Sequence, residues 1–176
     1  RLGLLEKINA LIADGIIPPF IVVLPQEDVF KPHQTSLFAD ALVEELIPYV
    51  DAHYETQTDR KYRGIGGISR GAAWAVRIGF THFNTFSRVG VHSLPAFEAD
   101  TGRINAWITS ILRKDLPVFF IDIGRDDPDW QSAQTFANQL NENNVPHEWY
   151  LFKDGHTESY WTSHLEQYLH WYAKDW

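Results

Sequence analysis

A serine between two glycines is the arrangement in this chain best suited to chemistry, in the stretch Gly67-Ile68-Ser69-Arg70-Gly71. The strand-like run 62–66 precedes it, and the small-residue helical run 72–76 follows it. A serine at a sharp strand-to-helix turn projects its hydroxyl above the sheet edge, where the positive end of the helix dipole also points. The pattern therefore indicates that Ser69 is a nucleophile for acyl transfer. The alternative is that Ser69 only caps the helix that follows.

A nucleophilic serine needs a base to accept its proton and a carboxylate to orient that base. His156 follows the strand-like run 147–152, and carboxylates gather at the end of the apolar run 118–121. The serine, the acids and the histidine occur in the chain order that such a mechanism uses on an α/β sheet. His156 could instead be a surface loop histidine. The acid stays open among four residues, namely Asp122, which we expect inside the strand, Asp126, Asp127 and Asp129.

Asp127 precedes Pro128, and an aspartate before proline commonly opens a helix, so Asp127 could be only a helix cap. The backbone N–H of Arg70 is the candidate oxyanion donor, and its side chain could either attract anionic substrate groups or be solvated.

Four further side chains are candidates for lining a substrate pocket, although aromatic residues at such positions more often serve packing. They are His33, His92, Trp130 and Trp161. The chain has no cysteine and no His-Glu-x-x-His pattern, so we predict neither a metal nor a cofactor.

Alternating helical and strand-like patterns surround these residues. Strands separated by helices of this length predict right-handed crossovers and a parallel sheet covered by helices on both faces. The longest loops, 26–35 and 94–102, would lie near the carboxyl ends of strands, where such sheets bind ligands. Helices are expected at 2–13, 36–53, 72–80, 103–112, 130–143 and 157–172, and strands at 20–24, 62–67, 86–91, 117–121 and 147–152.

Bulk composition limits the function classes. The 176 residues, 44% of them hydrophobic, predict one folded domain, and the net charge of -8 argues against nucleic acid and anionic membranes as partners. Because no apolar run is long enough to span a bilayer, we expect a soluble protein, and the sequence does not decide between the cytoplasm and secretion.

Several stretches of the chain resemble a family of esterases within the α/β-hydrolase superfamily, which includes esterase D, feruloyl esterases, enterochelin esterases and mycolyltransferases. The stretches are 16–25, 45–51, the nucleophile segment 63–71, the acid loop 124–127 and the histidine loop 155–156. The resemblance implies a three-layer αβα fold with a mostly parallel sheet, and the triad Ser69, His156 and Asp127. It covers nearly the whole chain and does not identify a substrate.

The family also carries an earlier strand, which ends in a loop that supplies a second oxyanion donor. This chain resembles the family only from the helix after that loop, so we expect a single domain, 1–176, that is truncated at its N-terminus relative to the family. By the family's strand order, the lost strand would lie between the strands at 20–24 and 62–67. Three arrangements remain open: an additional segment of the native gene, exchange of a strand with another chain in an oligomer, or direct pairing of the two flanking strands.

The leading hypothesis is a serine carboxylesterase that acts on a small-molecule ester through an acyl-enzyme intermediate. One alternative is an acyltransferase that uses the same triad to pass the acyl group to an alcohol. A second alternative is a non-catalytic module that binds a ligand beside an incomplete oxyanion hole.

Overall fold

A computed structural model describes residues 2–28 and 31–176 of the chain. Within these residues, four strands form one parallel sheet in the order β1-β2-β3-β4. The strands are β1 (Gly64–Ile68), β2 (Arg88–His92), β3 (Val118–Gly124) and β4 (His147–Phe152). Spatial order follows chain order, so each crossover places the next strand beside the last. We expected about five strands. The one predicted at 20–24 does not form beside β1.

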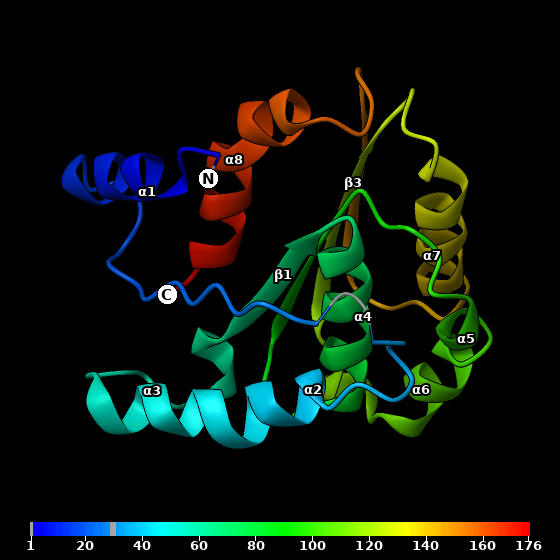
Figure 1. Cartoon of the computed structure of the whole chain (residues 1–176), viewed down its shortest axis with the longest axis horizontal. Helices are drawn as coiled ribbons and strands as arrows, with labels where there is room; N and C mark the ends of the chain where they lie inside the picture. Colours follow the sequence, from blue (N-terminus) through cyan, green and yellow to red (C-terminus); the bar gives the residue numbers. More distant parts are fainter. Residues whose placement is uncertain (1, 29–30) are drawn as a thin grey trace.

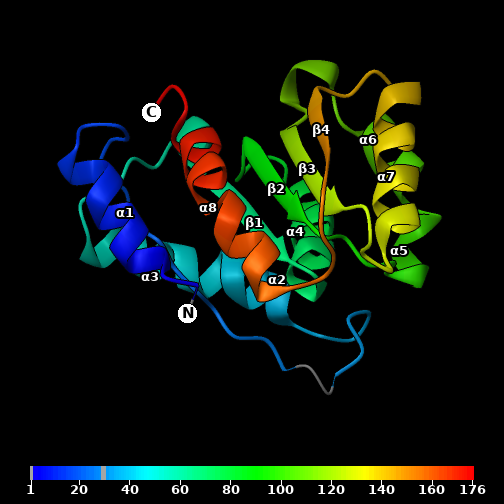
Figure 2. The ribbon, with the colours of Figure 1, turned by 90° about the horizontal axis from the view of Figure 1, so that it is seen from above.

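Helices cover both faces of the sheet, which confirms the three-layer arrangement (Figure 1). One face carries α4 (Arg70–Thr81), α6 (Ile104–Ser110) and α7 (Trp130–Glu142), and the other carries α8 (Glu158–Ala173) with α1 (Leu4–Ala13) packed beside it. Figure 2 shows α1 and α8 on one side of the strands and α6 and α7 on the other. The shorter elements are α2 (Phe38–Asp40), α3 (Ile47–His53), α5 (Glu98–Thr101) and the 3-10 turns η2 (Arg60–Tyr62) and η3 (Arg113–Asp115).

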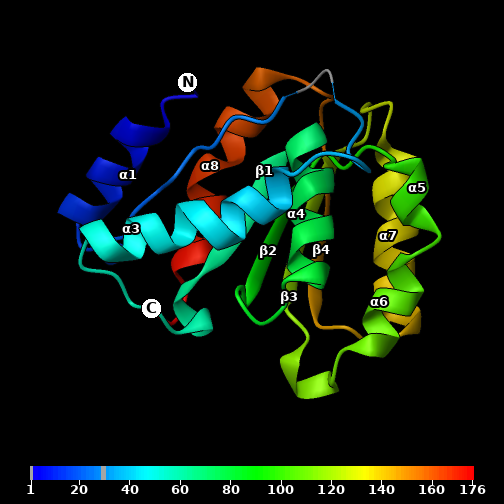
Figure 3. The ribbon, with the colours of Figure 1, turned by 60° about the horizontal axis from the view of Figure 1, so that its bottom comes forward.

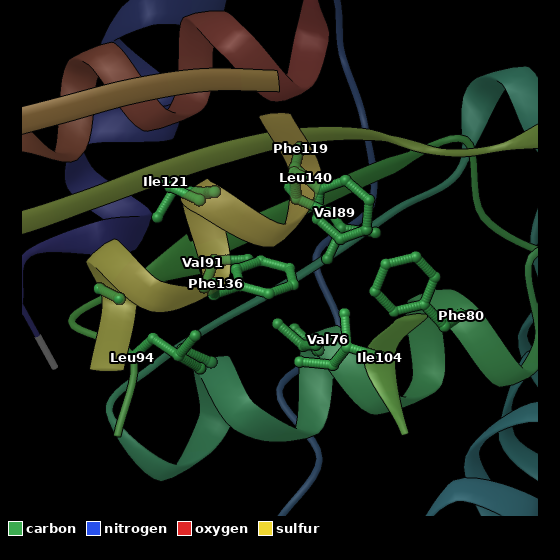
Figure 4. Close-up of a cluster of buried hydrophobic side chains, with 14 of the residues drawn as sticks. Val76, Phe80, Val89, Val91, Leu94, Ile104, Phe119, Ile121, Phe136 and Leu140 are labelled. Atoms are coloured by element: carbon green, nitrogen blue, oxygen red, sulfur yellow. The ribbon is translucent and has the colours of Figure 1, made fainter. Parts of the chain in front are cut away.

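The larger core lies between the sheet and the α4–α6–α7 layer (Figure 4). Alternate residues of β2 and β3 point into this core, while Phe120 points to the opposite face, toward α8. This alternation is the two-residue period of a strand, and both faces are apolar because helices cover both. The side chains from the strands in this core include Val89, Val91, Phe119, Ile121 and Ile123.

Most of the expected elements are present within a few residues of their predicted bounds, and β4 has the predicted bounds. The helix expected at 36–53 is divided, because a π-helical segment, η1 (Ala41–Leu46), separates α2 from α3. Pro48 stands at the start of α3 and has no N–H to donate to the preceding turn. A proline of this kind favours a local change of helical geometry.

The strand predicted at 20–24 is wrong, because these residues form no regular structure. Figure 3 shows this segment crossing the molecule as irregular chain between α1 and α2. A strand needs a neighbouring strand to pair with its backbone, and a groove of about 940 Å³ separates residues 18–25 from β1. The two segments therefore do not pair directly, and β1 is an edge strand of the described sheet.

Among the described residues, no helix is long and apolar enough to cross a membrane.

Candidate active site

Ser69 lies at the turn between β1 and α4, with backbone angles of φ 54° and ψ -125°. This conformation is strained for a residue with a side chain, and it lifts the hydroxyl out of the sheet edge. The Ser69 N–H donates to the His92 carbonyl over 2.8 Å, so the turn is tied to the end of β2. A side chain at Gly67 would overlap the backbone of Gly71, so the turn requires glycine at position 67.

His156 lies in the loop that joins β4 to α8. Asp154 in this loop has a φ of 90°, and its carbonyl accepts the Asp126 N–H over 3.0 Å. Gly124 at the end of β3 has no room for a β-carbon, because the Asp154 carbonyl occupies that space. At the far end of the loop, the Thr157 side chain accepts the Tyr160 N–H over 3.2 Å and caps α8. Contacts on both sides therefore fix the path of the histidine loop.

Asp127 lies in the loop that follows β3, and its side chain is fully buried. One carboxylate oxygen, Oδ1, accepts the Asp129 N–H over 2.9 Å, and the other, Oδ2, lies 2.9 Å from Nδ1 of His156. Asp126, the rival candidate, is exposed, and Asp122 is buried inside β3. Asp129 is more distant, because its Oδ2 lies 3.9 Å from Nδ1 of His156.

The three side chains form one continuous chain of hydrogen bonds. Ser69 Oγ lies 2.9 Å from His156 Nε2, and His156 Nδ1 lies 2.9 Å from Asp127 Oδ2. The imidazole is 26% exposed while the carboxylate is covered, so a substrate can approach the serine and the histidine but not the acid. The arrangement matches the geometry in which a carboxylate orients an imidazole that accepts a serine proton.

Arg70 is the first residue of α4, where the N–H groups have no acceptor within the helix. Its backbone N–H is therefore suited to a developing oxyanion beside Ser69. Its side chain forms an ion pair with Glu27, which also accepts the indole N–H of Trp74. The Arg70 guanidinium lies 5.4 Å from the centre of the Phe97 ring. The Glu27 carboxylate offsets the charge of the guanidinium. The Arg70 side chain is thus held in an ion pair with loop 26–35, whereas we had expected it to attract anionic substrate groups or to be solvated.

The four side chains proposed to line a pocket lie in different environments. His92 is 4% exposed and points into the interior, where its Nδ1 contacts Asp122 over 2.5 Å. His33 is also buried, with its ring stacked 4.0 Å from that of Phe97. The structure therefore places both histidines in packed positions and corrects their assignment to a pocket surface.

The two tryptophans lie closer to the surface. Trp130 begins α7 and is 42% exposed. Trp161, in the first turn of α8, lies beside His156 with ring centres 5.0 Å apart and planes at 86°. Of the four candidates, Trp161 is the one whose ring contacts a member of the hydrogen-bond chain.

Asp127, Asp129 and His156 offer ligand atoms that all lie within 4.8 Å of one another. In this structure, Nδ1 of His156 and Oδ2 of Asp127 are already bonded to each other. A metal ion bound there would displace the hydrogen bond that orients the imidazole, so the donor set fits the hydrogen-bonded chain better than a metal centre.

Sequence reasoning missed two residues near this site. Ser93 follows β2 as Ser69 follows β1, and its hydroxyl accepts the Trp161 indole N–H over 2.9 Å. Glu27 holds Arg70 from a loop that is 43 residues away in the sequence. A serine directly after a strand is a weak signal for Ser93, whereas the Glu27 contact depends on tertiary folding and has no local signal.

Comparison with known proteins places this chain in a family. The model of the family described as "Putative esterase" matches residues 3–173. A solved structure named ferulic acid esterase is 19% identical, with a TM-score of 0.81, and the match covers 96% of this chain and 76% of that one. The feruloyl esterase module from Clostridium thermocellum is 14% identical, with a TM-score of 0.81, 98% of this chain covered and 70% of the other.

The S-formylglutathione hydrolase of Staphylococcus aureus is also similar, at 19% identity and a TM-score of 0.66. That match covers 78% of this chain and 64% of the hydrolase, so this chain spans less than two thirds of its length. At these identities the likeness shows the fold. The α/β-hydrolase fold implied by the sequence resemblance is confirmed, with a sheet that has fewer strands than we expected.

Proposed function

The chain belongs to the esterase family of carboxylic ester hydrolases, and we propose that it cleaves small-molecule esters with Ser69 as nucleophile, His156 as base and Asp127 as orienting acid. The single observation that carries this proposal is the pair of 2.9 Å contacts that link the three side chains. His156 is 29 positions from Asp127 and 87 positions from Ser69 in the sequence, so the folded sheet is needed to align the three side chains.

In the proposed reaction, Ser69 Oγ attacks the ester carbonyl carbon while its proton passes to His156 Nε2. The tetrahedral intermediate then collapses, the bond to the alcohol breaks, and the alcohol oxygen takes the proton from Nε2. Water repeats the sequence on the acyl-enzyme, releasing the carboxylic acid and restoring Ser69. The Asp127 carboxylate stabilises the imidazolium formed in each half of the reaction and keeps its own negative charge.

The negative charge on the substrate oxygen would be stabilised by the Arg70 N–H at the start of α4. The helix dipole adds to this stabilisation because its positive end faces the same position. Removal of one oxyanion donor typically costs about 100-fold to 1,000-fold in turnover. The Arg70 N–H, at the start of α4, is therefore the donor that this proposal assigns to the oxyanion.

The direct test replaces Ser69 with alanine and measures hydrolysis of p-nitrophenyl acetate and methyl ferulate. Methyl ferulate is included because two of the similar structures are named as esterases of ferulic or feruloyl groups. We expect hydrolysis by Ser69→Ala to fall by about 10⁴-fold or more, with an unchanged far-UV circular dichroism spectrum. Ser110→Ala, at an exposed serine on α6, is the matched control and should keep full activity.

A fluorophosphonate probe provides an independent readout, because it labels an activated serine covalently. Mass spectrometry should place the label on Ser69, and the label should be absent from Ser69→Ala. Undiminished hydrolysis by Ser69→Ala, or labelling elsewhere in the chain, would remove Ser69 from the mechanism. For the wild-type protein, product analysis in the presence of a competing alcohol would distinguish transfer of the acyl group from hydrolysis.

A further inference from the structure

The imidazole of His156 must hold one orientation to face Ser69 and Asp127 together. Hydrogen bonds at its two ring nitrogens define a line through the ring, and they do not stop the ring from tilting about that line. Trp161 contacts the ring from the side, with the two planes nearly perpendicular at 86° and the centres 5.0 Å apart. Edge-to-face contacts of this type favour a definite relative orientation of two rings. Trp161 is therefore placed to restrict the motion that the hydrogen bonds allow.

Trp161 is itself held by a hydrogen bond to the residue that directly follows β2. Its indole Nε1–H donates to Ser93 Oγ over 2.9 Å. Ser93 is fully buried, has a φ of 55°, and donates its backbone N–H to the Asp122 carbonyl over 2.9 Å. A residue held in this left-handed conformation without being glycine is strained, and such strain concentrates at functional sites.

The hydroxyl of Ser93 and the elbow of Ser69 are also joined through the backbone. The residue before Ser93 is His92, whose carbonyl accepts the Ser69 N–H over 2.8 Å. The end of β2 thus holds the nucleophile through its backbone and the indole through the Ser93 side chain. A displacement of the indole relative to this strand end would change the position of the imidazole relative to Ser69 Oγ.

We propose that Ser93 and Trp161 form a positioning pair that holds the His156 ring in line between Ser69 and Asp127. The proposal rests on the proposed triad, and it assigns to the pair no contact with the reacting atoms. Proton transfer requires close alignment, and a misplacement of about 1 Å can cost on the order of 100-fold in rate. The pair should therefore affect turnover more than substrate binding.

Three variants separate the two components of the pair. Trp161→Phe keeps an aromatic ring but loses the N–H, Ser93→Ala removes the acceptor of that N–H, and Trp161→Ala removes both interactions. With p-nitrophenyl acetate, we expect kcat to fall about 10-fold to 100-fold in Trp161→Ala, by the alignment argument. KM should stay within about two-fold in the same variant, because the pair is not assigned to substrate binding.

Trp161→Phe and Ser93→Ala should each show an intermediate loss in kcat. Their double variant should lose no more than the larger single loss, because both changes break the same hydrogen bond. Tyr54→Ala, at an exposed aromatic residue after α3, is the control and should leave kcat unchanged.

The second readout does not depend on turnover. The proton shared by His156 Nδ1 and Asp127 should give a downfield NMR signal in the wild-type protein, assigned by its loss in Asp127→Asn. We expect this signal to weaken or vanish through solvent exchange in Trp161→Ala and to persist in Tyr54→Ala. Failure of the triad mechanism would instead appear as activity retained by Ser69→Ala, so the two failures are distinguishable.

A Trp161→Ala protein with wild-type kcat and an unchanged downfield signal would overturn the proposal. A rise in the KM of Trp161→Ala by about 10-fold to 100-fold with no change in kcat would overturn it as well, because the indole would then serve substrate binding. A loss of kcat and of the downfield signal in Trp161→Ala with a native circular dichroism spectrum, together with non-additive losses in the double variant, would support it.

Discussion

Gly67 and Gly71 flank Ser69 symmetrically in the sequence, but their surroundings in the structure differ. A β-carbon at Gly67 would overlap the carbonyl group of Gly71, which belongs to the backbone and cannot move aside. A β-carbon at Gly71 would meet nothing within 4 Å. Steric need for a small residue is thus confined to position 67, although the sequence pattern presents the two glycines as equivalent.

We predict that Gly67→Ala destabilises the protein by about 1–3 kcal/mol, the usual cost of an overpacked position. Esterase activity should fall much further, because the overlap displaces the turn that carries Ser69. Gly71→Ala should keep activity and gain up to about 1 kcal/mol from the higher helix propensity of alanine. Urea unfolding and p-nitrophenyl acetate kinetics measure both effects. Equal losses in the two variants would contradict this assignment.

Residue types predicted the members of the hydrogen-bond chain better than they predicted its surroundings. Ser69 and His156 stand out because each follows a strand-like run and has flanking residues typical of its role. Among the four aspartates, local pattern alone could not choose, and the family resemblance favoured Asp127. Trp161 was proposed as a pocket residue, but its bond to Ser93 joins residues 68 positions apart and leaves no local pattern.

At the scale of elements, apolar content alone did not decide whether residues 20–24 form a strand. The run is as apolar as the segment that became β3, yet no strand lies beside it within the described part of the chain. Ile21 and Leu24 are 48% and 71% exposed, and the groove separates them from β1. A strand is defined by pairing, so an apolar run without a partner stays irregular. By contrast, β2, β3 and β4 each pair with an adjacent strand, and local pattern predicted them well.

The buried His33 of loop 26–35 should make the stability of the protein depend on pH. The imidazole is buried between the Phe97 and Trp74 rings, and burial lowers its pKa because the charged form loses solvation. Asp100, whose Oδ2 lies 3.8 Å from Nε2, opposes this shift but is the smaller effect. The folded protein therefore binds a proton less readily at this site than the unfolded chain does.

Below the ordinary histidine pKa of about 6.5, the unfolded chain takes up a proton that folded His33 resists. We predict that the free energy of unfolding does not change through His33 above this pH, and that it decreases as the pH falls from there toward the lowered pKa of the folded protein. His33→Phe keeps the aromatic packing and should reduce the loss of stability between pH 7 and pH 5. Gln34→Phe, at an exposed neighbour, should leave the slope unchanged. Identical pH slopes in wild type and His33→Phe would contradict the prediction.

At the scale of the whole molecule, a buried polar cluster joins α8 to the middle of the sheet. Asp122 on β3 is fully buried and accepts hydrogen bonds from the hydroxyls of Tyr160 and Tyr168, at 2.7 Å and 2.6 Å. Its other oxygen contacts His92 on β2. The same helix begins directly after the histidine loop, so this cluster fixes the position of α8 and thereby of that loop.

Burial raises the pKa of the Tyr160 and Tyr168 hydroxyls, and the nearby Asp122 carboxylate raises them further. The folded protein keeps both protons above pH 10, where tyrosines of the unfolded chain lose theirs. The unfolded state then binds fewer protons, so the free energy of unfolding must fall as the pH rises above about 10. Each such tyrosine can add a slope of up to about 1.4 kcal/mol per pH unit.

We therefore predict two changes in Tyr168→Phe, measured by urea unfolding between pH 8 and pH 11. At pH 8 the variant should be less stable by about 1–3 kcal/mol, because Asp122 stays buried and loses one donor. Above pH 10 its curve should fall less steeply than that of the wild type, because one titrating group is gone. Tyr54→Phe, at a residue 59% exposed, should match the wild type at pH 8. Parallel curves for wild type and Tyr168→Phe above pH 10 would mean that the cluster does not hold the tyrosine protons, and the tie between α8 and the sheet would need another explanation.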